Sequence, residues 1–201
     1  VDAVSEFILH AEKLGHTPET EEHDVYHGHE VQGGGSTKMT TEEAMKQGYG
    51  VIDGGATRTM ASITALEYAR DAGRSRALGD IIVGVDLEDK PRFGFADSES
   101  AQCTSTCLVN LPVADKSIKL RVHALDKGSV PVLLSIQTLR NMGAVVDYAR
   151  DEAIFTKLDP RKRISLNTTT SGHQVLPLVQ DFMQGGTILD NPFHRLGQAE
   201  E

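Results

Sequence analysis

The sequence is short of cysteines, of basic residues and of long apolar runs, and each shortage excludes a class of protein. Two cysteines in 201 residues cannot form a disulfide framework, so a reducing or neutral compartment is the default expectation. Twenty Lys and Arg residues against 29 Asp and Glu give a net charge of −9, which argues against nucleic acid and anionic lipid as partners. The densest apolar run, Val130–Ile136, is far shorter than the roughly 18 residues of a membrane helix, so no transmembrane segment is expected.

The chain begins at Val1, without an initiator Met. We therefore expect a processed product or the ordered part of something longer, from which any signal or transit peptide has been removed. An organellar location after such processing is one interpretation, and the residues themselves do not identify the compartment.

Local composition predicts three segments. Residues 1–48 show helical spacing of apolar residues over Val4–Leu14 and a short helix capped by Thr40 or Thr41, but hold too little apolar surface to fold alone. We interpret them as a partly helical N-terminal arm laid on the next domain or on a partner. Residues 49–158 alternate short β-prone runs with turns, which favours an all-β barrel or sandwich. Residues 159–201 are interpreted as a C-terminal extension, with His173–Leu178 as a candidate for one more strand.

Within residues 49–158 we predict eight strands and two helices. The strands are Tyr49–Asp53, Ile81–Val85, Arg92–Phe95, Cys103–Val113, Ser117–Leu125, Val130–Leu134, Ala144–Tyr148 and Ala153–Phe155. The helices are Ser62–Ala72, expected to end at Gly73, and Ile136–Met142, expected to end at Gly143 as a C′ glycine.

The stretch that carries chemistry is Gly50–Thr57, in which an apolar strand delivers Asp53 onto a glycine turn. A later apolar strand, Val130–Ser135, runs into a short helix and then into Gly143–Tyr148. This pairing resembles the retropepsin-like aspartic proteases of retroviruses and retrotransposons, in which an Asp-Thr/Ser-Gly-Ala turn holds the catalytic Asp. It is also similar to retroelement proteases abundant in dinoflagellate genomes, which carry a stretch like Gly172–Leu178. The resemblance covers about residues 49–178.

The resemblance implies a mostly β fold, namely a retropepsin-like acid-protease barrel with two short helices and extended N- and C-terminal arms. It assigns the catalytic turn to Asp53, Gly54, Gly55, Ala56 and Thr57. One Asp per chain cannot perform general acid–base hydrolysis, but a homodimer can place two Asp53 carboxylates side by side. Like charges that close share one proton, so one carboxyl takes a proton from water while the other polarises the scissile carbonyl of a peptide substrate. A hairpin must cover the substrate, and we place this flap around Phe95–Thr104, with its turn at residues 96–98.

Two positions depart from the family pattern. Gly54 replaces the Thr or Ser whose hydroxyl, in the family, hydrogen-bonds across the dimer and stiffens the paired turns. Ser135 stands where a glycine usually enters the short helix, and serine is a good N-cap residue. Neither change removes the carboxylate.

We interpret the other residues that could take part in catalysis or binding as structural. Asp53 itself could be only a turn aspartate, and Asp147 is interpreted as a strand-end residue. Cys103 and Cys107 are four apart on one predicted strand, hence on one face, but no second ligand pair accompanies them, so we interpret them as reduced thiols. In an acidic stretch, a metal could be held by His23, Asp24, His27 and His29. However, the chain has eight histidines, so such a cluster arises easily by chance. Gly33–Gly35 lacks the features of a phosphate loop, and no cofactor or metal is expected.

Three functions remain open. The first is a homodimeric aspartic endopeptidase derived from a retroelement. The second is a catalytically silent protein of protease fold that serves as a structural subunit of a larger assembly with protein partners, even an organellar or photosynthetic one; Gly54 and the two long arms favour it. The third is a peptide-binding module that holds substrates without cutting them. What faces Asp53 would discriminate among them.

Overall fold

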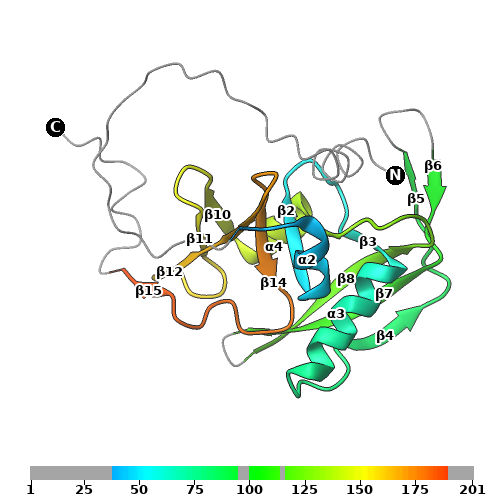
Figure 1. Cartoon of the computed structure of the whole chain (residues 1–201), viewed down its shortest axis with the longest axis horizontal. Coiled ribbons are helices and arrows are strands. Elements are labelled where there is room, and N and C mark those ends of the chain that lie inside the picture. Colours follow the sequence, from blue (N-terminus) through cyan, green and yellow to red (C-terminus); the bar gives the residue numbers. More distant parts are fainter. Residues whose placement is uncertain (1–37, 95–99, 114–115, 190–201) are drawn as a thin grey trace.

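The computed structural model describes residues 38–94, 100–113 and 116–189, and in these ranges the chain is mostly β with three helices (Figure 1). The predominance of strands agrees with the prediction. The predicted helix over Val4–Leu14 lies outside the described residues.

The strands form a nine-stranded sheet, a four-stranded sheet and a hairpin. The large sheet has the order β1 (Lys38–Met39), β13 (Asn167–Thr169), β14 (Gln174–Pro177), β2 (Tyr49–Asp53), β9 (Val132–Ser135), β3 (Met60–Ser62), β8 (Lys116–Leu125), β7 (Ser105–Val113) and β4 (Ile82–Asp86). The small sheet has the order β10 (Ala144–Asp147), β11 (Glu152–Phe155), β12 (Lys162–Ser165) and β15 (Thr187–Ile188). The hairpin is made of β5 (Arg92–Gly94) and β6 (Ser100–Gln102). The end strands β1 and β4 do not pair with each other, so the described strands form open sheets and no closed barrel is seen among them.

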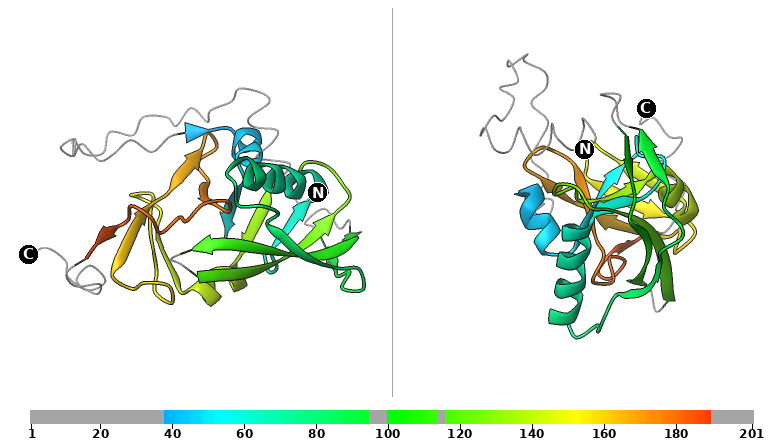
Figure 2. Two further views of the ribbon diagram at one scale, coloured as in Figure 1. Left: turned by 90° about the horizontal axis from the view of Figure 1, so that it is seen from below. Right: turned by 90° about the vertical axis from the view of Figure 1, so that its right-hand side faces the viewer.

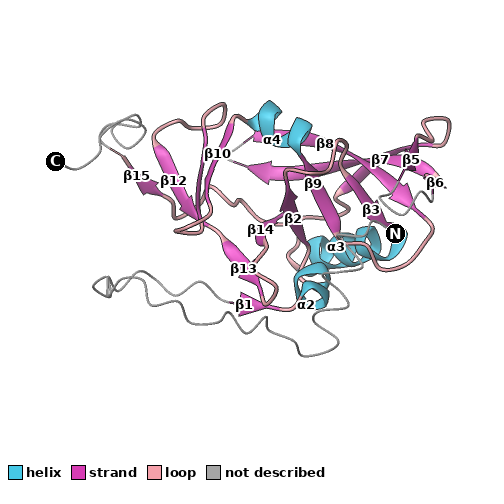
Figure 3. Cartoon of the chain, turned by 90° about the horizontal axis from the view of Figure 1, so that it is seen from above, coloured by secondary structure: helices cyan, strands magenta, loops and turns pink. Residues whose placement is uncertain are grey.

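Three short helices cover the central strands. They are α2 (Thr41–Lys46), α3 (Ile63–Ser75) and α4 (Ile136–Met142). Helices α2 and α3 lie together on one side of the large sheet, and α4 lies on the opposite side (Figures 2 and 3). The predicted capped helix is confirmed as α2: the Glu43 amide donates to Thr40 Oγ1 at 3.1 Å, and the Thr40 amide donates to Glu43 Oε2 at 2.8 Å.

One helix boundary differs from the prediction. The predicted helix Ser62–Ala72 is α3, but Ser62 is its N-cap, and the helix continues through Gly73 to Ser75. Gly73 is a packing residue there, because a Cβ on it would lie 2.7 Å from the Ile81 side chain. Helix α4, in contrast, has the predicted bounds, and Gly143 ends it with a left-handed φ of 66°.

The segments predicted as arms contribute strands and core to the same fold. Strand β1 pairs in parallel with β13, and β14 lies between β13 and β2 in the large sheet. Val175 and Leu176 of β14 are completely buried. The core therefore continues past the predicted boundary between residues 158 and 159. Strand β14, which follows that boundary, pairs with β2, the strand that ends at Asp53.

Candidate functional site

The Asp53 turn lies at one end of the three central strands. Strands β2 and β9 are parallel, and Asp53 pairs with Ser135, the last residue of β9. On its other side β9 pairs with β3, which runs in the opposite direction, through Met60 and Leu133. Strand β9 is thus flanked by β2 and β3, and the connection from Asp53 to Met60 crosses its end just where α4 begins.

The Asp53 carboxylate is oriented by its own turn. The amides of Gly55 and Ala56 donate to Asp53 Oδ1 at 2.8 and 3.1 Å. Within the described ranges no hydrogen bond or ion pair involves Oδ2, and the residue is only partly buried. One oxygen is therefore held by the backbone and the other is available to a ligand or a second carboxyl group.

The two glycines of the turn have different reasons to be glycine. A Cβ on Gly55 would lie 3.2 Å from Asp53 Oδ1, so a side chain there would crowd the carboxylate. A Cβ on Gly54 would have no neighbour within 4 Å, and the φ of Gly54 is outside the left-handed region. Nothing in the described part of the chain therefore demands glycine at position 54.

Buried contacts fasten the turn to the start of α4. The Ile136 amide donates to the Ala56 carbonyl at 3.0 Å. The Ser135 amide donates to Thr59 Oγ1 at 3.0 Å, and this hydroxyl also lies 3.1 Å from Ser135 Oγ and 2.8 Å from Thr138 Oγ1. Ser135 is the N-cap of α4 and accepts from the Thr138 amide, which confirms its predicted suitability as a cap. The last predicted site residue, Thr57, is exposed.

Thr59 is a residue of this site that no pattern in the sequence predicted. Its hydroxyl is buried with Ser135, 76 residues further along the chain. A threonine in a polar loop carries no local signal of such a contact, because only the pairing of β9 with β2 and β3 brings the two together.

The predicted flap coincides in part with the β5–β6 hairpin. Arg92 pairs with Gln102, and Gly94 pairs with Ser100. The turn predicted at residues 96–98 lies outside the described residues. At the base of the hairpin the Phe93 ring contacts the His123 ring, with centroids 5.8 Å apart.

A second polar cluster surrounds this buried His123. Its Nδ1 lies 2.7 Å from Thr106 Oγ1, which donates in turn to the Asp89 carbonyl at 2.8 Å. Burial lowers the pKa of His123, while the negative charge of Asp89 acts in the opposite direction. The Thr106 hydroxyl and then the Arg121 guanidinium, whose Nη2 is 2.6 Å from Asp89 Oδ2, lower the pKa of Asp89. The cluster therefore holds a neutral imidazole and a paired carboxylate at neutral pH.

Both cysteines are free and buried, but they do not share the predicted face. Cys103 precedes β7 and belongs to the same hydrophobic cluster as Phe93, whereas Cys107 lies within β7 in the other cluster. Burial raises the pKa of the Cys103 thiol to about 11, with a further rise from the Asp89 carboxylate, and burial also raises the pKa of Cys107. Protonated, buried thiols are poor nucleophiles, so neither cysteine fits a catalytic role.

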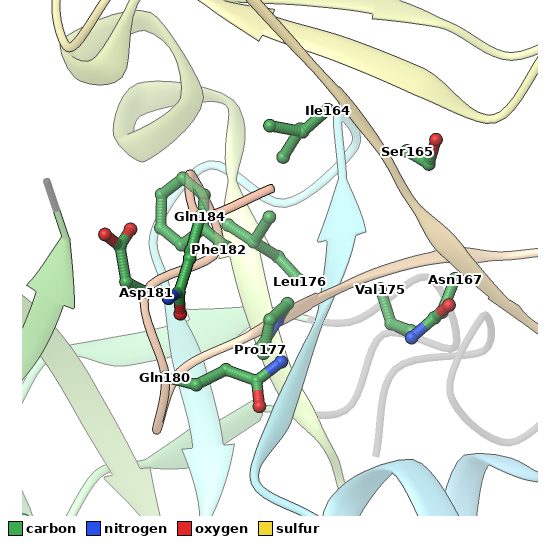
Figure 4. Close-up of a pocket in the computed structure, with 10 residues that line it drawn as sticks. All are labelled: Ile164, Ser165, Asn167, Val175, Leu176, Pro177, Gln180, Asp181, Phe182 and Gln184. Carbon is green, nitrogen blue, oxygen red and sulfur yellow. The ribbon is translucent and has the colours of Figure 1, made fainter. Parts of the chain in front are cut away.

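A cavity of about 150 Å³ lies elsewhere, between β14, β12 and the segment that follows β14 (Figure 4). Its lining includes Asn167, Gln180, Asp181 and Gln184, and none of the five predicted site residues.

Among residues 38–94, 100–113 and 116–189, no group of three or more His, Cys, Asp or Glu side chains is arranged to hold a metal ion. The histidine-containing group at residues 23–29 lies outside these ranges. The longest described helix, α3, has 13 residues, and none of the three is long and apolar enough to cross a bilayer.

No protein-family model matches this chain, and no curated protein sequence matches it.

Proposed function

We propose that this chain is a retropepsin-like aspartic endopeptidase that acts as a homodimer, with Asp53 of each chain supplying one catalytic carboxylate. The observation that carries the proposal is the Asp53 carboxylate itself. The Gly55 and Ala56 amides hold Oδ1, and no described group bonds to Oδ2. Two such carboxyl groups facing each other would share one proton and activate a water molecule between them.

The surroundings of Asp53 support this chemistry. The turn is fastened to the start of α4 by the bonds of Ala56 and Thr59, so the carboxylate is carried on a rigid base. Rigid placement favours catalysis because less reorganisation is needed when charge develops. The β5–β6 hairpin supplies a candidate cover that would exclude water from a bound peptide.

A second function, a silent structural subunit, is favoured by one observation. Position 54 has open space for a side chain, yet it lacks the hydroxyl that the resemblance places across the dimer axis. Without that bond the two turns would be held together less firmly. The two functions differ in what lies against Asp53, either a second Asp53 or an unrelated partner.

The decisive experiment is digestion of a complex peptide mixture by the purified full chain, read by mass spectrometry. We expect cleavage to be strongest at acidic pH, where the pair of carboxyl groups holds one proton. Asp53→Asn should abolish it, because an amide cannot act as the base but keeps nearly the same shape.

Asp147→Asn is the matched control. Asp147 Oδ1 accepts from the Ala149 and Arg150 amides at 3.0 and 3.1 Å, the same turn geometry as at Asp53. Its charge, however, is paired with Arg150 at 3.0 Å, which lowers the pKa of Asp147. This variant should cut as the wild type does. Cleavage that survives Asp53→Asn, or wild-type protein that cuts no peptide at any pH, would overturn the proposal.

A further inference from the structure

Strand β4 leaves one edge of the large sheet open. It is the last strand in the order and, among the described residues, pairs only with β7 (Figure 1). The register shifts between Ile82 and Gly84, so regular pairing to β7 runs from Gly84 to Asp86. The outer backbone groups of an edge strand are a template for one more strand.

The open edge carries an unusual amount of exposed apolar surface. Val83 and Val85 of β4 and Leu87, the residue that follows the strand, are spaced two apart and are 51%, 56% and 62% exposed. Val85 pairs with Cys107, and Cys107 pairs with Val122, so the three residues form one row across the sheet. Cys107 and Val122 are buried, and the row ends on an uncovered valine. An apolar side chain on an added strand would continue the row and remove Val85 from water.

The acidic residues beside this edge favour a basic partner strand. Asp86 belongs to the neighbouring row, and its Oδ1 accepts from the Glu88 and Asp89 amides. No cation in the described ranges pairs with Asp86 or Glu88, whereas Asp89 is paired with Arg121. A second copy of this chain would bring more acid to the edge, since each copy carries a net charge of −9. A strand with Lys or Arg opposite Asp86 would form a favourable cross-strand pair.

We propose that β4 is a docking strand for an extended segment of a partner protein in which apolar and basic side chains alternate. The segment adds to the sheet along Gly84–Leu87 through backbone hydrogen bonds. One of its apolar side chains lies beside Val85 and one of its basic side chains beside Asp86. This inference does not depend on Asp53 being catalytic.

The test measures fluorescence anisotropy of a labelled ten-residue peptide of alternating valine and lysine, titrated with the full chain carrying Asp53→Asn so that no cleavage can occur. Val85→Lys should weaken binding at least about tenfold, because the apolar row is interrupted by a charge. Ile188→Lys is the matched control: Ile188 is 58% exposed on β15, the edge strand of the small sheet, and the net charge changes equally. It should change binding less than about twofold, since only general attraction is altered.

A second pair of measurements tests the charge preference. Asp86→Asn keeps an acceptor for the Glu88 and Asp89 amides but removes the charge, so the preference for the valine–lysine peptide over a valine–glutamate peptide should shrink. Hydrogen exchange at residues 84–87 should slow when the valine–lysine peptide is present. Equal weakening by Val85→Lys and Ile188→Lys would overturn the proposal. So would sedimentation showing that the chain associates with itself through β4, since the occupant would then be a second copy.

Discussion

At the residue scale, the Asp53 turn combines one constrained and one unconstrained glycine. Gly55 gives room to the carboxylate, whereas Gly54 has empty space around it. No described residue of the chain requires glycine at position 54, so a substitution there should act mainly through a partner that lies against the turn. Position 54 is therefore the most direct probe of the proposed dimer.

Gly54→Thr should fold, since a Cβ there meets nothing within 4 Å and φ is outside the left-handed region. In a homodimer the new hydroxyl should tighten self-association, with each regained hydrogen bond contributing roughly 0.5–1.5 kcal/mol. Two such bonds form by symmetry. Sedimentation across a dilution series, with peptide cleavage measured in parallel, checks this. Unchanged association in a folded variant would mean that residue 54 does not face a symmetry mate, which would favour the structural subunit.

His123 should make stability depend on pH. Burial holds the pKa of His123 in the folded chain below the 6.5 of a free histidine, against the opposing effect of Asp89. The unfolded chain therefore takes up a proton first, and the free energy of unfolding should fall as pH drops below about 6.5. Asp89 has a lowered pKa and contributes a separate loss only at more acidic pH, below about 3.8.

Urea unfolding at a series of pH values checks this dependence in wild type and His123→Gln. The glutamine does not titrate, so the decrease between pH 7 and pH 5 should become smaller in the variant. Two curves of identical slope over that interval would show that His123 is not the group responsible.

At the element scale, the start of α4 links the two halves of the proposed site. Ser135 ends β9, caps α4 and pairs with Asp53 in register. Buried Thr59 accepts the hydrogen bond of the Ser135 amide. Loss of the Thr59 hydroxyl should therefore destabilise both the N-cap of α4 and the turn that holds the Asp53 carboxylate.

Thr59→Val keeps the shape of the side chain but leaves the buried Ser135 amide without its acceptor. The cost should be about 1–3 kcal/mol of unfolding free energy, as for other buried donors that lose their partner. Thr57→Val is the control, because Thr57 lies in the same turn but is exposed, and it should change stability by less than about 0.5 kcal/mol. Denaturant unfolding of both variants measures the difference. Equal effects would show that the buried hydroxyl contributes nothing specific.

At the scale of the whole molecule, the described residues share their sheets and core across the predicted segment boundaries. Strand β14 lies directly beside β2, with Val175 opposite Val51. Leu166, Leu178 and Met183 are also almost fully buried. The sheet that positions Asp53 therefore depends on residues more than a hundred positions away.

A chain ending at residue 158 should fail to fold, because it would expose β2 and remove several fully buried side chains, each of which contributes about 1.5–3 kcal/mol. Circular dichroism and thermal unfolding of the truncated and full chains test this. A cooperative transition near that of the full chain would show that residues 159–201 are an extension after all.

The sequence alone determined the elements whose signals are local. The capping box at Thr40, the cap at Ser135 and the left-handed glycine at position 143 each depend on neighbours within a few residues, and the structure has all three. The strand leading to Asp53 was equally clear, because its apolar residues are consecutive and a glycine turn follows.

The tertiary structure decided what depends on distant partners. Gly73 was expected to end a helix, but the Ile81 side chain makes it a close-packing position inside the last turn. Thr59 became part of the site only because β9 lies between β2 and β3, and the C-terminal segment became core only because β14 pairs with β2. A single sequence records which residues favour a strand, but the choice of neighbouring strand is a comparison of long-range burial and hydrogen bonding that no local pattern contains.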